Sequence, residues 1–245
     1  MKIGIADYGL NVWYGNLYSY RDRLAMLKEL GYEGIERLEV KNQAEAIEYC
    51  ADARGMGMDF GYCRSLSTME TIRFSAALGL KYVWAESNAG DLDTFCRHVN
   101  YQAEAAAKYG LKVGLHNHLG TPVESQDEVE KFLEKCPAAG LVFDAGHLAG
   151  AYGDPMYILE KYYDRVITVH VKDFVYKDRD NKNWCERLRF CELGGGEMGD
   201  INRDVVSFLV KKNFNGWLCV EHDTHLKDPV IDLKISRDYI RKCGV

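Results

Sequence analysis

Residues 111–118 read LKVGLHNH and residues 141–147 read LVFDAGH, and a stretch of helical character separates them. Each is a short apolar run that closes on polar residues, which is typical of a buried parallel strand. Because residues two apart on a strand point to the same side, we expect His116 and His118 to share a face. The two stretches therefore predict consecutive strands whose ends carry side chains that bind metals.

Two later stretches repeat this pattern, VITVHVKD at residues 166–173 and WLCVEH at residues 217–222. Asp144 closes the second of the four runs, His170 the third and Glu221 the fourth. Parallel strands present their carboxyl ends at one edge of a sheet or at one mouth of a barrel. Four such strands therefore suggest one shared site.

Strand-like and helix-like segments alternate along the whole chain. Strands are expected at residues 3–6, 34–38, 56–61, 81–86, 112–118, 141–144, 166–171 and 217–221. Helices are expected after Ser19, at residues 44–54, around 72–76, at 93–110, 125–136, after Asp154, at 204–212 and after Asp228. Residues 7–20 and about thirty residues after 171 are expected as loops. Eight strand–helix pairs predict an α/β fold, a single (β/α)8 TIM barrel formed as one domain by residues 1–245.

Composition excludes several classes of function. The formal net charge of −6 opposes a nucleic-acid partner, which normally requires a basic face. No apolar run approaches the roughly 18–20 residues that span a bilayer, and the first strand begins at Ile3, so we expect neither a membrane segment nor a signal peptide. The eight cysteines are scattered without a Cys-x-x-Cys pair, which favours a reduced, cytoplasmic protein. The sequence leaves open whether the protein forms a homo-oligomer.

His116, Asp144, His170 and Glu221 are the candidate metal ligands, because all four fall at carboxyl ends of strands. Two imidazoles and two carboxylates suit one divalent ion, Mn²⁺, Co²⁺, Fe²⁺ or Zn²⁺. Any one of these residues alone would be better explained as a satisfied core group or a solvated loop residue. Their joint occurrence on four strands favours a metal site.

Three further residues are candidates for chemistry beside the metal. His118 is an alternative ligand, a base, or a hydrogen-bonding partner of the ligands. His147 lies three residues after Asp144, where it could bind a substrate hydroxyl or cap the next helix. Lys172 should point inward, where it could stabilise a substrate oxygen or enolate, or form a structural pair with Glu86 or Asp173.

Three more residues are candidates for substrate contact. Glu86 closes the fourth expected strand, where it could carry a proton, although a salt bridge explains it equally well. Trp13 and Trp184 lie in long expected loops and could stack on a sugar ring, or could simply pack against the protein.

Four motifs carry a family resemblance: HNHLGT at 116–121, FDAGH at 143–147, HVKD at 170–173 and GWLCVE at 216–221. Over residues 111–229 the chain resembles the xylose isomerase-like barrels, which include sugar isomerases, epimerases, inosose dehydratases and apurinic endonucleases. The strongest local likeness is to the inosose dehydratases, although the chain looks shorter than they are. The resemblance implies a divalent-metal enzyme, with manganese favoured, that acts on a keto-sugar or keto-cyclitol.

One departure from the family pattern bears on the reaction. His116 stands where the epimerases and isomerases usually have a glutamate that binds metal and moves a proton. Elimination needs only one base, one acid and a metal-held carbonyl, so the substitution favours a dehydratase. His118 or Glu221 would be the base and His147 the acid, with Lys172 assisting. The alternatives are a sugar isomerase or epimerase and, less favoured, an endonuclease-like hydrolase or a non-catalytic binding barrel.

Overall fold

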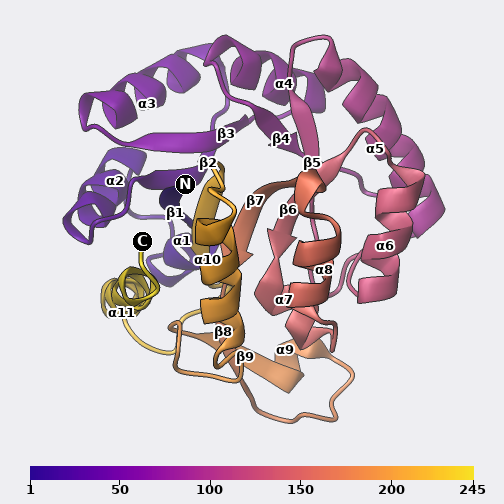
Figure 1. Ribbon diagram of the computed structural model, residues 1–245. Helices are drawn as coiled ribbons and strands as arrows, with labels where there is room; N and C mark the ends of the chain where they lie inside the picture. The colour runs from indigo at the N-terminus through magenta and orange to yellow at the C-terminus, as the bar shows by residue number, and fades with distance from the viewer.

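The computed structural model describes residues 1–245, in which eight parallel strands are surrounded by helices (Figure 1). The strands pair in the order β3-β2-β1-β10-β7-β6-β5-β4. β3 and β4, at the two edges of the sheet, are not hydrogen-bonded to each other. The rings of Tyr62 on β3 and Tyr82 on β4 nevertheless pack together, with centroids 5.8 Å apart. The sheet is thus a nearly closed barrel, and the predicted (β/α)8 fold is confirmed. The strands are β1 (Lys2–Ala6), β2 (Gly34–Glu39), β3 (Asp59–Arg64), β4 (Tyr82–Trp84), β5 (Lys112–His116), β6 (Gly140–Asp144), β7 (Val166–Val171) and β10 (Trp217–Glu221).

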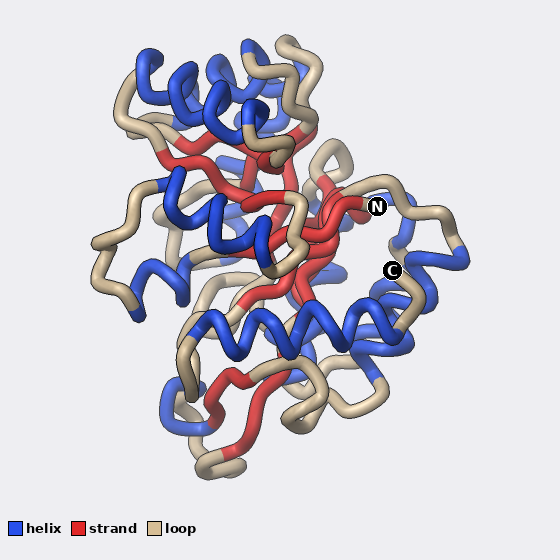
Figure 2. Tube along the Cα trace, turned by 90° about the vertical axis from the view of Figure 1, so that its left-hand side faces the viewer, coloured by secondary structure: helices blue, strands red, loops and turns tan.

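The helices lie outside the strands, which gather at the centre of the molecule (Figure 2). Ser19 and Ser125 begin α2 and α6 with capping boxes, in which the serine oxygen accepts the backbone N–H of Asp22 or Glu128. No helix has both the length and the apolar character that crossing a membrane requires. The helices between the strands are α2 (Tyr20–Glu29), α3 (Gln43–Gly55), α4 (Thr68–Ala77), α5 (Leu92–Ala107), α6 (Gln126–Lys135), α8 (Pro155–Lys161), α10 (Ile201–Lys211) and α11 (Pro229–Lys242), and a 3-10 turn, η1 (Tyr163–Arg165), precedes β7.

Both regions predicted as long loops contain regular structure. Residues 7–20 include α1 (Tyr8–Trp13), too short for helical periodicity to show in the sequence. The region after β7 contains the antiparallel hairpin β8 (Asp173–Tyr176) and β9 (Leu188–Cys191) with α9 (Trp184–Arg187) between them, at the lower edge of Figure 1. A further short helix, α7 (Ala145–Gly150), follows β6 without a loop.

Two strands end earlier than predicted. β5 stops at His116 instead of His118, because the Asn117 side chain takes over the pairing: its Nδ2 donates to the Asp144 carbonyl and its Oδ1 accepts the Asp144 N–H, both at 2.9 Å. β4 stops at Trp84 instead of Glu86. His118 therefore lies just after the strand instead of on it, but its ring still lies beside that of His116, with centroids 5.5 Å apart, as the sequence predicted.

Candidate active site

The side chains of His116, Asp144, His170 and Glu221 meet at the carboxyl ends of β5, β6, β7 and β10. One donor atom from each lies within 4.8 Å of all the others. His116 Nε2 is 3.4 Å from Asp144 Oδ2 and 3.3 Å from Glu221 Oε2. His170 Nδ1 is 2.7 Å from Glu221 Oε2 and 3.6 Å from Asp144 Oδ2. The structure thus brings together the four residues proposed as ligands, which we call the central cluster.

Glu36, on β2, contacts the ring nitrogen of His170 that points away from the central cluster. Its Oε2 lies 2.7 Å from His170 Nε2, while its Oε1 accepts the Tyr82 hydroxyl at 2.8 Å and the Trp84 indole N–H at 3.1 Å. A carboxylate on one imidazole nitrogen fixes the tautomer and leaves the other nitrogen as a ligand, which is the usual support of a metal-binding histidine. His170 Nδ1 is accordingly the nitrogen that faces the cluster.

The charges of the central cluster favour a cation. Burial raises the pKa of Asp144 and Glu221, but the Lys172 ammonium and the neighbouring histidines together outweigh burial and hold both pKa values well below the usual range. Burial lowers the pKa of His170, yet the carboxylates of Glu36 and Glu221 raise it well above its usual value. A positive charge is therefore stabilised between these groups, whether a proton or a metal ion supplies it. Two imidazoles and two ionised carboxylates fit a divalent transition metal.

Lys172 is completely buried and joins the central cluster to two more residues, Asp223 and His147. Its Nζ lies 3.1 Å from both Asp144 Oδ2 and Glu221 Oε2 and 3.2 Å from Asp223 Oδ2. It also donates to His147 Nε2 at 2.7 Å. The predicted alternative pairs with Glu86 or Asp173 do not form. Asp173 instead accepts the backbone N–H groups of Phe174, Gly194 and Met198.

The rings of His118 and His147 pack against each other beside Asp223, with centroids 3.7 Å apart and planes tilted by 43°. His118 Nδ1 donates to the Leu119 carbonyl at 2.6 Å, and its Nε2 lies 3.3 Å from Asp223 Oδ1. Burial lowers the pKa of His118, but the hydrogen bond and charge of Asp223 outweigh burial and raise it. Burial and then the Lys172 charge hold the pKa of His147 well below its usual value. Both nitrogens of His118 thus face oxygen acceptors, which favours its protonated form, whereas the surroundings of His147 favour its neutral form.

A sequence profile of the xylose isomerase-like TIM barrel matches residues 24–243. The chain belongs to this family. An inosose dehydratase from Lactiplantibacillus plantarum is 33% identical over 162 residues, which cover 61% of this chain and 53% of that protein. The chain therefore spans about half the length of the curated relatives it matches.

Two solved structures share the barrel over nearly the whole chain. A probable 3-DHS dehydratase involved in petrobactin synthesis, from Bacillus anthracis, superposes with a TM-score of 0.74 at 16% identity, covering 98% of this chain and 99% of that one. The 3-keto-D-glucoside 4-epimerase of E. coli gives a TM-score of 0.70 at 15% identity, covering 99% and 100%. At these identities the likeness shows a common fold.

The remaining candidates are spread over the mouth of this xylose isomerase-like barrel. Trp184 lies beside His118 and His147, with its ring centroid 5.8 Å from that of His118. Glu86 is not in the central cluster; its Oε1 pairs with Arg64 Nε at 2.9 Å. Trp13 lies on α1, where its ring packs edge-on against His225 at 6.5 Å.

Glu36 and Asp223 were missed by the sequence reasoning. Asp223 follows Glu221 by two residues, so the spacing that singled out His116 and His118 would also have singled it out. Glu36 carried no such signal, because it lies in the middle of the strand GIERLE instead of at its end. Only the tertiary structure, in which the strands form a barrel, shows that the Glu36 side chain reaches His170.

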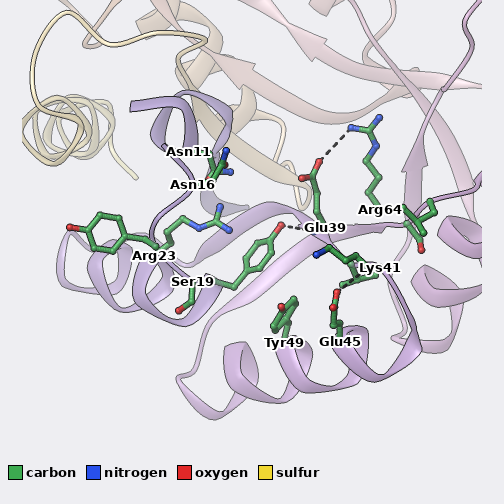
Figure 3. Close-up of a pocket in the computed structure, with 14 residues that line it drawn as sticks. Asn11, Asn16, Ser19, Arg23, Glu39, Lys41, Glu45, Tyr49 and Arg64 are labelled. Carbon is green, nitrogen blue, oxygen red and sulfur yellow. Dashed lines mark hydrogen bonds and ion pairs between the residues drawn. The ribbon is translucent and has the colours of Figure 1, made fainter. Parts of the chain in front are cut away.

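A pocket of about 660 Å³ opens beside the strand ends of the first half of the barrel (Figure 3). Glu39, from the end of β2, and Arg64, from the end of β3, face each other in it at 3.5 Å. Tyr20 and Tyr49 line its other side, with ring centroids 5.1 Å apart. Glu39 and Arg64 close β2 and β3, so the pocket lies at the same end of the barrel as the central cluster. Both polar and aromatic side chains line it.

Proposed function

We propose that this chain is a cytoplasmic, divalent-metal-dependent lyase that removes water from a keto-cyclitol or keto-sugar, of the inosose dehydratase type. The name and identity of the L. plantarum relative support the substrate class, and so does the dehydratase name of the B. anthracis neighbour. His116, Asp144, His170 and Glu221 would hold one metal ion, with Mn²⁺ favoured. Such an ion would supply a Lewis acid that polarises the substrate carbonyl.

The observation that carries this proposal is that the site offers one free carboxylate oxygen and one proton-holding imidazole. Every polar contact of Glu221 in the cluster runs through Oε2. Its Oε1 is therefore available to take the proton next to the substrate carbonyl. This narrows the two expected base candidates to Glu221, because His118 donates through Nδ1 and faces a carboxylate at Nε2.

His118 is accordingly the proposed acid, in place of His147. In the elimination, the proton next to the carbonyl passes to Glu221 Oε1 and the electron pair of that C–H bond forms the new C=C bond. The C–O bond at the β-carbon breaks, and the departing hydroxyl leaves as water with the proton of His118. The products are water and an unsaturated ketone, so atoms and charge balance.

Lys172 and His147 act together in this scheme. His147 Nε2 accepts a hydrogen bond from the Lys172 ammonium, so it orients the lysine and cannot donate a proton from that nitrogen. The ammonium is a fixed positive charge among Asp144, Glu221 and Asp223. We propose that it stabilises negative charge on the substrate oxygen as the neighbouring proton is lost.

The closest rival is an epimerase, which the name of the E. coli structural neighbour favours. An epimerase needs a proton carrier on each side of the carbon. Glu36 could be the second carboxylate, but His170, Tyr82 and Trp84 occupy both its oxygens. Glu86 is held by Arg64. The arrangement of carboxylates therefore favours elimination over inversion.

The test is a panel of keto-cyclitols and keto-sugars incubated in D₂O with the Mn²⁺-loaded protein and followed by NMR. We expect metal-dependent loss of water from at least one substrate, with a vinylic signal or that of the diketone tautomer. Epimer or aldose–ketose interconversion with deuterium incorporated and no dehydrated product would contradict the lyase assignment. It would leave the isomerase or epimerase in its place.

A further inference from the structure

A second group of ligand-type side chains, His222, His225 and Asp232, lies outside the central cluster. His222 directly follows β10, His225 lies in the next turn, and Asp232 is in the first turn of α11. One donor atom of each lies within 4.8 Å of the others. His225 Nδ1 is 2.8 Å from Asp232 Oδ2, and His222 Nε2 is 3.3 Å from Asp232 Oδ1.

These side chains are closed off from solvent. The side chains of His222 and Asp232 are 1% and 0% exposed, and that of His225 is 3% exposed. Trp13 packs edge-on against the His225 ring. A Cβ at Gly9 would collide with the His222 carbonyl, so α1 lies directly against the group. A dry, enclosed position of this kind strengthens the attraction between a carboxylate and any cation that it holds.

Internal hydrogen bonds satisfy the group only in part, through the contact of His225 Nδ1 with Asp232 Oδ2 at 2.8 Å. His222 Nδ1 and Asp232 Oδ1 are buried and have no hydrogen-bond partner, although His222 Nε2 donates to the Cys191 carbonyl at 2.7 Å. No lysine or arginine forms an ion pair with Asp232. Only a protonated His222 or His225, or a metal ion, can then neutralise this buried carboxylate, and buried charges are normally paired or bound to a metal.

We propose that His222, His225 and Asp232 form a second divalent-metal site, which ties the segment after β10 to α11. Two imidazoles and one carboxylate are a ligand set that Zn²⁺ accepts, with a further position left open. Because Glu221 points into the central cluster and His222 contacts the end of β9 and α11, the two sites lie on opposite sides of the end of β10. This site goes beyond the proposed lyase activity and does not depend on it.

The experiment measures how many zinc ions the full chain binds. The protein is stripped with a chelator, desalted, loaded with Zn²⁺, freed of excess metal by gel filtration, and measured by elemental analysis. We expect two equivalents in the wild type, one in His225→Gln and one in Asp232→Asn. His98→Gln is the matched control, because His98 is an exposed histidine that bonds only Ser87; it should keep two equivalents.

The second site and the central cluster can be distinguished with Asp144→Asn. Loss of one equivalent in Asp144→Asn and of the other in His225→Gln supports both sites. A wild type with one equivalent, lost in His225→Gln but kept in Asp144→Asn, supports only the second site. If His225→Gln holds as much zinc as His98→Gln, or if the wild type holds none, the second site is wrong. His225→Gln is the variant to rely on if Asp232→Asn proves unstable, since His225 lies in a loop.

Discussion

The two halves of the barrel contribute differently to the candidate site. β5, β6, β7 and β10 supply all four residues of the central cluster, each at or near the carboxyl end of its strand. β2 supplies Glu36, which contacts His170 Nε2, and β4 supplies Tyr82 and Trp84, which donate to Glu36. The later strands thus present the reactive groups, and the earlier strands fix their orientation. Substitutions in the two halves should accordingly have effects of different size and kind.

The largest effect is expected for Asp144→Asn. The amide can still accept the His147 N–H that begins α7, as Asp144 Oδ1 does at 2.6 Å, so the fold should be retained. The substitution removes the negative charge that faces His116 and Lys172. We therefore expect activity to fall by roughly 10³-fold or more, together with loss of the central metal. Asp154→Asn is the matched control, because Asp154 begins α8 in the same way but touches no site residue. Full metal occupancy in Asp144→Asn would remove Asp144 from the ligand set.

His118→Gln and Glu221→Gln should separate the two halves of the reaction. Each is expected to lower dehydration by about 10²–10⁴-fold, the usual contribution of a general acid or base, and Glu221→Gln should also weaken metal binding because Glu221 is a proposed ligand. In D₂O, His118→Gln should still exchange the proton next to the carbonyl, because Glu221 Oε1 remains. Glu221→Gln should not exchange it. Loss of exchange in both variants, with metal retained in His118→Gln, would show that His118 is the base.

Glu36→Gln tests the supporting half of the barrel. The amide can still accept from Tyr82, but it no longer provides a charge to His170 Nε2, so we expect metal affinity to fall by about 10–100-fold. Glu39→Gln, on the same strand but half-exposed, should leave the affinity unchanged. Equal affinities in the two variants would mean that β2 plays no part in holding the metal.

The smallest effect is expected for Glu86→Gln. The Glu86–Arg64 pair is partly exposed, and such pairs stabilise a fold by at most about 1 kcal/mol. We therefore expect a small drop in the unfolding free energy, measured with urea, and a change in activity below about twofold. Glu130→Gln, which breaks a comparable pair with Lys161, is the control for stability. A large rise in KM for Glu86→Gln alone would place Glu86 against the substrate, as the sequence analysis considered.

The sequence predicted the later strands well because their signal is local. Apolar runs that end on Asp144, His170 or Glu221 mark buried strands and residues of the central cluster at the same time. Ser19 and Ser125 marked helix starts for a similar reason, since a cap acts within three residues. The errors fell where the signal was too short or came from a distant residue. α1 spans six residues, and β5 ends early because Asn117 bonds to Asp144, 27 positions away.

The sequence by itself therefore determined the order of the eight barrel strands and their main helices, the family, and the four residues of the central cluster, because each rests on neighbours close in the chain. Only the tertiary structure decided which side chains support them. Glu36 reaches His170 across 134 positions, and Asp232 meets His222 only where α11 returns to the end of β10. It also decided the opposite pKa shifts of His118 and His147, because Asp223 raises the pKa of His118 while burial and the Lys172 charge lower that of His147. Charge and burial act through space, so their effects appear only once the barrel brings distant segments together.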